Sequence, residues 1–390
     1  MKIAFLDVYN PIPINSGGDW YRFHLLNDMG QRHEVTEYFM YEEDGKTGFL
    51  PPRIPFGTRH IPSILPWGKF TKILEIYKPE YLVYQALFRD IPAEIVFTTV
   101  YSYHFAKIIS KNQRVPLVLV MHNIEWQYLK GSKSPLYKPM KIYEHYVMAH
   151  VDAIVALSPR DCEYVRSNFP EKKLFYIPPG VDTTKYQSGG SKYDFGNDKC
   201  NLLFYGALDR EQNVEGLKFI ISSLIPALKL SGLMPRIRMN VFGSGKPPKE
   251  IDLAGNPDIN YLGYVDDVER YIRGADAILV PLKNSGGIKV RILESLACGK
   301  PVIASPEAKS GLPDDISMCI HIASSTSEFV NKINQILTNE CPVKVDLDFS
   351  KGYLSENSTS DIIEYFEEIK RSSHNSPDHD GTCQVNLSDR

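Results

Sequence analysis

A glycine pair leads into a charged, helix-forming stretch at residues 284–305, which read NSGGIKVRILESLACGKPVIAS. Gly286 and Gly287, with Ser285 before them, allow a backbone to approach a ligand closely, and we expect a helix to begin near Ile288. The free N–H groups and the dipole at the start of a helix favour a bound phosphate. The stretch therefore predicts one wall of a phosphate site.

Two charged side chains of this expected helix, Arg291 and Glu294, lie three residues apart and therefore share one face. Arginine can pair bidentately with a phosphate, and a carboxylate can accept hydrogen bonds from both hydroxyls of a ribose. By spacing alone, a surface ion pair of little energetic value is the more common explanation of such a pair.

The first half of the chain repeats the glycine geometry at residues 15–20, NSGGDW, where Gly17 and Gly18 can bring backbone amides to an anionic ligand. A flexible loop between a strand and a helix is the ordinary alternative. His122, in VMHNIEW, follows a strongly apolar strand, where a histidine can bond a sugar hydroxyl or shuttle a proton. A histidine satisfied by backbone groups is an equally good interpretation there.

A third glycine loop, FYGALDREQN at residues 204–213, follows the first strand of the second half. Gly206 allows close approach, and Arg210 and Asn213 are polar candidates, although Asn213 suits a helix N-cap equally well. The glycines of VFGSGKPP lack the spacing of a P-loop and enter a proline pair rather than a helix. The two D-x-D triplets follow no clear strand, so we expect no metal site in either.

Short apolar strands alternate with amphipathic helices along nearly the whole chain, as in KIAFLDV, PLVLVMH and NLLFYGAL and the helical stretches between them. This alternation predicts parallel strands joined by crossover helices in doubly wound α/β sheets. A Gly-, Ser- and charge-rich break at residues 177–199 separates two such series. Ligands bind beyond the carboxyl ends of such strands, so the space between two facing sheets is the expected site.

We expect four segments from this pattern. They are a Rossmann-like domain at residues 1–180, a second Rossmann-like domain at 181–352, a helix at 353–372 that is a candidate to cross back to the first domain, and a polar, disordered tail at 373–390. The Pro-rich stretch at residues 48–68 is expected to be a surface loop.

The composition excludes several classes of protein. A formal net charge of −3 gives no basic excess, so we expect no nucleic-acid partner. No leader peptide and no apolar run of membrane-spanning length is visible, and the six dispersed cysteines fit reduced thiols, so we expect a cytoplasmic protein. Basic and aromatic residues in and beside the Pro-rich stretch are candidates for peripheral membrane contact, although an exposed loop explains them as well: Arg53, Arg59, Trp67 and Lys69.

Together these pieces resemble a retaining glycosyltransferase of the GT-B fold, in the large family-four, glycogen-synthase-like group. The resemblance covers nearly the whole chain. Residues 13–39 resemble the family's N-terminal glycine loop and helix, residues 156–186 its domain junction, and residues 282–312 its donor-site helix, which is the most specific piece.

The resemblance implies an α/β, GT-B architecture of two facing Rossmann-like domains with a central cleft. The first domain, residues 1–180, would lie on the acceptor side, and the second, residues 181–352, would bind the nucleotide sugar. It implies transfer of a sugar from a nucleotide diphosphate sugar to a hydroxyl of a carbohydrate or lipid-linked acceptor, with retention at the anomeric carbon and with neither metal nor further cofactor. Polysaccharide or glycoconjugate synthesis would be the setting, with the enzyme in the cytoplasm or on the cytoplasmic face of a membrane.

The resemblance also implies roles for individual residues. Glu294 would bind the ribose hydroxyls, His122 would contact the donor sugar, and Arg291 would stabilise the leaving diphosphate. The remaining candidates would line the donor site: Gly17, Gly18, Gly206, Arg210, Tyr264, Val265, Ser285, Gly286, Gly287, Ile288 and Lys289.

Three positions depart from the family pattern. The family carries two glutamates separated by seven residues; Glu294 matches the second, whereas the first falls on Gly286. The arginine and lysine that usually follow the first strand of the second domain fall on Ala207 and Gln212. Two alternatives therefore stay open, namely a non-catalytic GT-B scaffold subunit and a nucleotide-sugar epimerase that uses the same donor without an acceptor.

Overall fold

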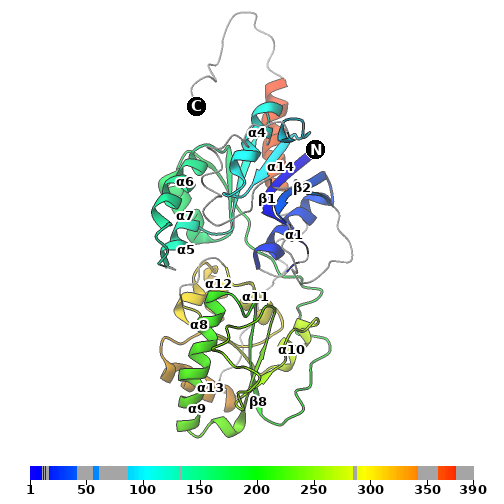
Figure 1. Ribbon diagram of the computed structural model, residues 1–390. Helices are drawn as coiled ribbons and strands as arrows, with labels where there is room; N and C mark the ends of the chain where they lie inside the picture. The colour runs from blue at the N-terminus through cyan, green and yellow to red at the C-terminus, as the bar shows by residue number, and fades with distance from the viewer. Residues whose placement is uncertain are drawn as a thin grey trace, which may run out of the picture.

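The computed structural model describes residues 1–10, 12, 14, 17–41, 56–60, 87–131, 133–283, 288–340 and 359–374. These residues form two α/β lobes stacked one on the other (Figure 1). Each lobe is built on one sheet whose described strands all pair in parallel. The alternation in the sequence predicted such sheets, because crossover helices can join only parallel neighbours.

The first sheet has the strand order β3-β2-β1-β4-β5-β6-β7. The order reverses between β1 and β4, so the sheet is doubly wound with its switch point there. Its strands are β1 (Lys2–Tyr9), β2 (Glu34–Tyr41), β3 (Gly57–His60), β4 (Ile95–Thr98), β5 (Leu117–Met121), β6 (Ala153–Ala156) and β7 (Lys173–Tyr176).

Two helical layers cover the first sheet, and alternate residues of each strand face one layer or the other. Residues such as Leu6 and Leu119 contact the layer of α4 (Tyr103–Gln113), α5 (Glu125–Gly131), α6 (Tyr137–Ala149) and α7 (Pro159–Asn168). Residues such as Phe5 and Val120 contact the layer of α1 (Gly17–Gly30) and α14 (Ser360–His374).

Helix α14, red in Figure 1, joins the end of the chain to the first lobe. Its side chains Ile362, Ile363 and Phe366 pack into the hydrophobic core of the first lobe, and the Lys370 Nζ donates to the Glu94 carboxylate at 2.6 Å. The expected tail begins two residues too early, since α14 continues through His374; the residues after it lie outside the described part.

The second sheet has the order β10-β9-β8-β11-β12-β13, with its switch point between β8 and β11. The strands are β8 (Cys200–Tyr205), β9 (Ile237–Phe242), β10 (Ile259–Tyr261), β11 (Ala277–Val280), β12 (Val302–Ala304) and β13 (His321–Ile322). The helices are α8 (Glu211–Phe219), continued by η2 (Ile220–Leu224) and α9 (Ile225–Leu230), then η3 (Met234–Arg236), α10 (Val268–Gly274), α11 (Val290–Ala297), η4 (Pro306–Lys309), α12 (Asp314–Ser317) and α13 (Thr326–Leu337).

One sequence expectation about the fold is wrong. The Pro-rich stretch expected as a loop contains β3, an edge strand that pairs with β2 from Thr36–Gly57 to Phe39–His60. All four residues of β3 are exposed, so the strand carries no apolar alternation by which it could be recognised. Of the membrane-contact candidates, Arg59 lies on this strand, and Arg53, Trp67 and Lys69 lie outside the described residues.

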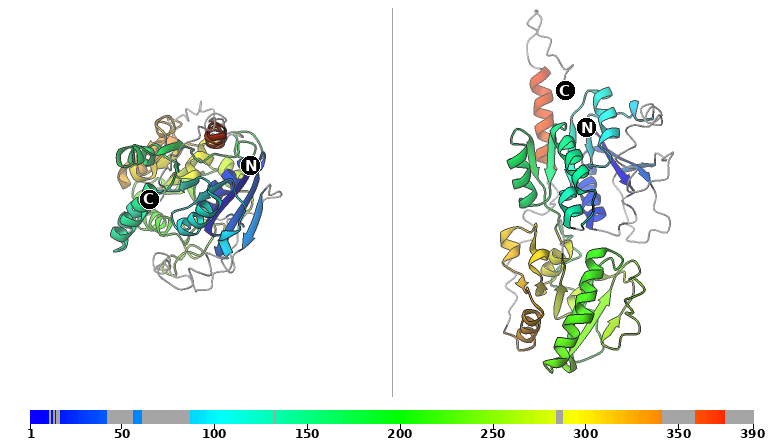
Figure 2. Two further views of the ribbon diagram at one scale, coloured as in Figure 1. Left: turned by 90° about the horizontal axis from the view of Figure 1, so that it is seen from above. Right: turned by 60° about the vertical axis from the view of Figure 1, so that its left-hand side comes forward.

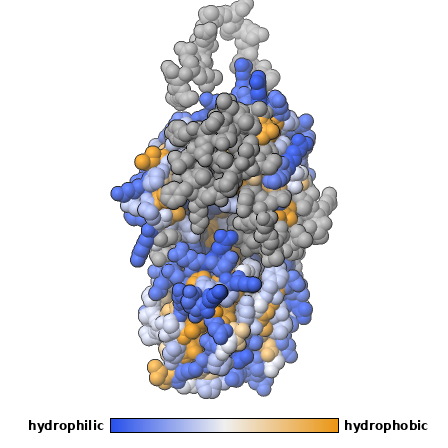
Figure 3. Space-filling model, in the orientation of Figure 1, coloured by the Kyte–Doolittle hydropathy of each residue, from blue (hydrophilic) through white to orange (hydrophobic). Residues whose placement is uncertain are grey.

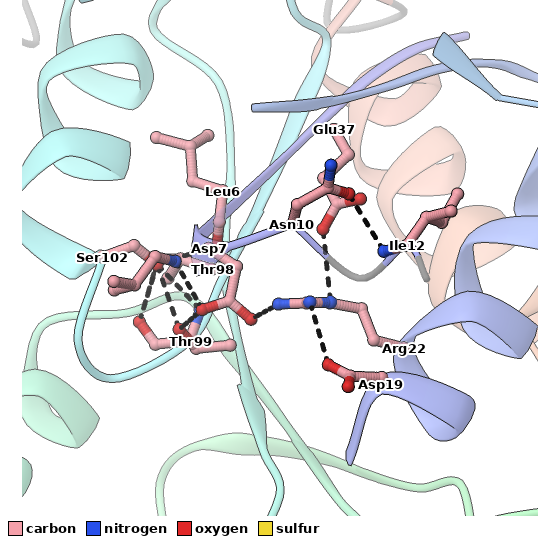
Figure 4. A network of polar contacts seen from close by, with 11 residues as sticks. Leu6, Asp7, Asn10, Ile12, Asp19, Arg22, Glu37, Thr98, Thr99 and Ser102 are labelled. Atoms are coloured by element: carbon pink, nitrogen blue, oxygen red, sulfur yellow. Dashed lines mark hydrogen bonds and ion pairs between the residues drawn. The ribbon is translucent and has the colours of Figure 1, made fainter. Parts of the chain in front are cut away.

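A buried polar network fixes α1 to the end of the first sheet (Figure 4). The Arg22 guanidinium is paired with Asp7 at the end of β1, with Glu37 of β2 at 3.2 Å and with Asp19 at 3.4 Å. Asp7 also accepts from the Thr99 hydroxyl at 3.0 Å. Glu37 is fully buried and Arg22 nearly so, which makes the single guanidinium the balancing charge for the buried carboxylates.

Arg22→Met should destabilise the first lobe by about 3–5 kcal/mol, because it leaves Asp7 and Glu37 buried without their cation. The matched control is Arg371→Ala, which removes an exposed pair with Glu367 and should cost at most about 1 kcal/mol. Urea unfolding followed by circular dichroism measures both variants. Equal urea midpoints for the two variants would show that the buried network does not stabilise the lobe by this amount.

Candidate functional site

The amino ends of two helices meet where the lobes face each other. A Cβ placed on Gly17, the first residue of α1, would lie 3.7 Å from Cγ2 of Val290, the first residue of α11. The Arg160 Nη1 of the first lobe also donates to the Ser310 hydroxyl of the second at 3.0 Å. Both helix dipoles are therefore directed with their positive ends at the junction of the lobes, an arrangement that favours an anion there.

Arg291 lies at the switch point of the second sheet, beside the loop that leaves β8. A Cβ on Gly206 would come within 2.6 Å of the Arg291 Nη2, and Gly206 has φ of +146°. Only glycine fits this position, because the guanidinium occupies the space of a side chain and the backbone lies in a region that other residues rarely adopt. The glycine predicted to allow close approach thus accommodates a side chain of the same protein.

Asn213 completes the support of this guanidinium. Its amide oxygen accepts from Arg291 Nη2 at 2.8 Å, and its amide nitrogen donates to the Ala207 carbonyl at 2.7 Å. Asn213 lies in the first turn of α8, whose N-cap position is Arg210, so it is not the N-cap. The Nη1 of Arg291 is buried and has no hydrogen-bond partner within the described ranges. A buried guanidinium donor without a partner is a candidate to pair with an anionic oxygen.

Glu294 is held one turn further along α11 by two tyrosines. The Tyr205 hydroxyl donates to Glu294 Oε2 at 3.0 Å, and the buried Tyr186 hydroxyl also bonds this carboxylate. Burial raises the pKa of the Glu294 carboxyl, and the two tyrosine hydrogen bonds and Arg291 oppose that rise. The pattern of the sequence could not reveal Tyr205 and Tyr186, because one is a strand residue and the other follows the domain junction.

Lys289 is buried at the N-cap position of α11, so the helix starts two residues later than the sequence predicted. Burial, together with the charge of Arg291, lowers the pKa of the Lys289 ammonium to about 7, and Asp161 of the first lobe acts in the opposite direction. Its protonation therefore changes near neutral pH. Ile288 is half-buried, and Ser285, Gly286 and Gly287 lie outside the described residues.

On the first lobe, Gly17 and Gly18 are the first two residues of α1 rather than members of a loop, and both are exposed. His122 follows β5, half-buried, with its ring edge-on to Tyr21 at 5.7 Å between centroids. Its Nδ1 is buried with no hydrogen-bond partner in the part of the chain that the structure describes. Burial lowers the pKa of His122, so the imidazole is neutral at pH 7.

The remaining candidates differ in what their side chains can reach. Arg210 is exposed at the start of α8. The Tyr264 side chain is 51% exposed after β10, whereas Val265 belongs to the core of the second lobe, so only its backbone is left for a ligand. Among the described residues, no cluster of His, Cys, Asp or Glu has the arrangement of a metal site, and no helix is long and apolar enough to span a bilayer.

Two glycosyltransferase family models match the chain, one on each lobe. The family described as Glycosyltransferase Family 4 matches residues 17–185, and the family described as Glycosyl transferases group 1 matches residues 199–339. The chain is 26% identical over 274 residues to an uncharacterized glycosyltransferase of Methanocaldococcus jannaschii. The aligned region covers 66% of this chain and 68% of the relative. It is 22% identical over 396 residues to an uncharacterized 44.6 kDa protein in the cps region of Klebsiella pneumoniae. This alignment covers 92% of this chain and 97% of the relative.

Solved structures with the same fold include sucrose-phosphate synthase of Thermosynechococcus elongatus, with a TM-score of 0.73 at 14% identity over 95% of this chain and 100% of that one. HepE of Anabaena in complex with UDP and glucose has a TM-score of 0.62 at 15% identity over 96% and 100%. These likenesses confirm the predicted fold of two facing Rossmann-like domains. With a matching glycosyltransferase model on each lobe, the chain belongs to the family-four, group 1 glycosyltransferases of the GT-B fold.

Proposed function

We propose that this glycosyltransferase moves a sugar from a nucleotide diphosphate sugar to a hydroxyl of a carbohydrate or lipid-linked acceptor, with retention at the anomeric carbon and without a metal. The observation that carries the proposal is the Arg291 guanidinium, held by Asn213 against Gly206 with Nη1 unpaired, beside the start of α11. A diphosphate supplies the anionic oxygens that this donor and the helix N-terminus lack.

The roles of the other residues follow from their distance along α11 and across the junction. Glu294, one turn beyond Arg291, would accept from the ribose hydroxyls in addition to the two tyrosine hydroxyls that hold it. Lys289 would add charge at the diphosphate, and residues 285–288 would contribute backbone groups. Gly17 and Gly18 would close the phosphate side from the first lobe, and the Tyr264 ring and the Val265 backbone would contact the base.

In the reaction, the acceptor oxygen would attack the anomeric carbon on the side from which the diphosphate leaves, and the acceptor proton would pass to the departing phosphate. Arg291 and the two helix N-termini would stabilise the charge that develops on the leaving diphosphate. His122, whose pKa is lowered by burial, would contact the donor sugar from the first lobe. The sequence relative in a cps region and the UDP in HepE support a role in surface polysaccharide or glycoconjugate synthesis with a UDP-sugar.

A scaffold without catalysis is the second candidate, because Gly286, Ala207 and Gln212 replace three charged residues of the family pattern. Differential scanning fluorimetry with UDP, GDP and ADP separates the two, since a ligand that binds only the folded state raises the melting temperature. We expect one nucleotide to raise it, and turnover of the matching nucleotide sugars to release free nucleotide. No shift with any of the three at millimolar concentration would favour the scaffold.

Glu294→Gln should weaken binding of the stabilising nucleotide about 10- to 100-fold, since a hydrogen bond to a charged group contributes about 1.5–3 kcal/mol. The variant keeps the size of the side chain and one acceptor for Tyr205. Glu340→Ala, an exposed residue after α13, is the control and should bind normally. Isothermal titration calorimetry measures both. An unchanged affinity for Glu294→Gln would remove the ribose role.

Gly206→Ala should displace Arg291 and reduce nucleotide affinity about tenfold or more, because the new methyl group overlaps Nη2. Gly232→Ala is the matched control: Gly232 also has positive φ, +71°, but nothing lies within 4 Å of its added Cβ. Both variants place a side chain at a positive φ, and only Gly206→Ala disturbs the guanidinium. Equal affinities would show that Arg291 does not contact the nucleotide.

Nucleotide affinity should fall as pH rises from 6 to 8.5, because Lys289, with a pKa of about 7, is charged at the lower end and neutral at the upper. Lys289→Met should flatten this dependence, whereas Lys283→Met, at an exposed position of the same loop, should keep it. The ionisation of the nucleotide itself affects all three proteins alike. Parallel pH profiles for the wild type and Lys289→Met would exclude Lys289 from the diphosphate site.

A further inference from the structure

The charged side chains that α4, α5 and α6 expose on the first lobe are all lysines. Helices α4, α5 and α6 lie on the same face of the first sheet (Figures 1 and 2); α5 packs against α6, and Lys107 of α4 contacts Tyr146 of α6. Four lysines on these helices are exposed: Lys111, Lys130, Lys138 and Lys141. On a chain with a net charge of −3, such a one-sided surface is a local feature rather than a consequence of composition.

The two acidic residues of these helices do not offset the lysines, because both are engaged inward. Glu144 is 1% exposed and accepts from the backbone N–H groups of Glu125 and Trp126 at 3.0 and 3.1 Å. The Glu125 carboxylate accepts from the Tyr101 hydroxyl at 2.9 Å. The acids therefore fix α5 at its start and leave the outer surface basic.

Two large apolar side chains stand among the lysines. Ile142 is 74% exposed and Tyr146 is 40% exposed, one turn apart on α6. Contacts between the helices make the surface continuous: Lys107 Nζ lies 3.4 Å from the Tyr146 hydroxyl, and Lys141 Nζ lies 4.8 Å from the centre of the Trp126 ring. We call this surface, formed by Lys111, Lys130, Lys138, Lys141, Ile142 and Tyr146, the α4–α6 face. In Figure 3, hydrophobic and strongly hydrophilic atoms lie next to one another at the left edge of the upper lobe.

We propose that the α4–α6 face binds the surface of an anionic lipid bilayer. Lysines near such a surface are attracted by the negative headgroups, and an aliphatic and an aromatic side chain between them suit the boundary between headgroups and acyl chains. A soluble polyanion would use the lysines alone and would leave Ile142 in water. The exposed isoleucine therefore favours the bilayer.

The position of the face relates it to the site between the lobes. Helix α5 begins three residues after His122, so the face adjoins the end of the first sheet that meets the second lobe. A bilayer at this face would present a lipid-linked acceptor beside the donor. The presentation of a lipid-linked acceptor rests on the proposed function. Binding to a bilayer does not, because it needs neither donor nor acceptor.

Vesicle flotation of the full chain tests the proposal, with phosphatidylcholine vesicles that either contain or lack phosphatidylglycerol. We expect binding to the anionic vesicles that weakens as salt is added. Lys138→Glu with Lys141→Glu should reduce it about tenfold or more, since each charge near the surface contributes several-fold. Lys246→Glu with Lys249→Glu, an exposed pair on the second lobe, is the matched control and should bind as the wild type does.

Ile142→Ser should also reduce vesicle binding, and Leu230→Ser, 91% exposed on α9, should not. The proposal is overturned if the wild type does not float with anionic vesicles, or if face and control variants lose binding equally. It is likewise overturned if Ile142→Ser leaves vesicle binding unchanged while heparin competes with the vesicles, because that result indicates a surface for polyanions in general. A change from dimer to monomer in Ile142→Ser would also overturn it, because the face would then be an interface between two copies of the chain. Nucleotide binding, measured on the same samples, reports separately on the proposed function.

Discussion

The contact between the Arg291 guanidinium and the bare Cα of Gly206 is the constraint on which the site depends. The arginine comes from the helix after β11 and the glycine from the loop after β8, so the contact exists only because the strand order reverses between these two strands. Asn213 fixes the remaining freedom of the guanidinium by bonding Nη2, and Nη1 has no hydrogen-bond partner among the described residues. A cation fixed in this way at a switch point needs no rearrangement when negative charge develops nearby, which is why the proposed site is centred on it.

The surrounding structure maintains this arrangement from both lobes. Tyr205 links the end of β8 to Glu294 and to the Arg291 carbonyl, so the same strand supports both charged side chains of α11. In the first lobe, Arg22 ties the start of α1 to β1 and β2, which holds the amino end of α1 against that of α11. These hydrogen bonds and ion pairs are buried, so solvent screens their charges little. Small changes in their geometry therefore change the interaction energy.

The sequence allowed much of this to be predicted, for physical reasons that differ from residue to residue. The alternation of strands and helices predicted both sheets, because parallel strands buried on two faces need apolar runs and crossover helices. The Gly206 loop and the Arg291–Glu294 spacing were singled out from the sequence, and the structure brings Arg291 against Gly206, where only glycine permits such close approach. The resemblance to a known family supplied the roles, which spacing alone could not separate from an ordinary surface ion pair.

What the sequence did not reveal depends on contacts between distant segments. In the sequence, Tyr186 and Tyr205 have no feature that links them to Glu294, and only the fold brings both hydroxyls to its carboxylate. In the same way, Asn213 suits a helix N-cap in the sequence, and only the structure shows that it bonds Arg291. The edge strand β3 escaped notice because none of its residues is buried.

A crystal structure of the full chain with bound UDP tests the central claim most directly. We expect a diphosphate oxygen within hydrogen-bond distance of Arg291 Nη1, at the amino end of α11, and the ribose hydroxyls on the Glu294 carboxylate. A nucleotide bound elsewhere, with Nη1 still unpaired and the space between α1 and α11 filled only by solvent, would contradict it.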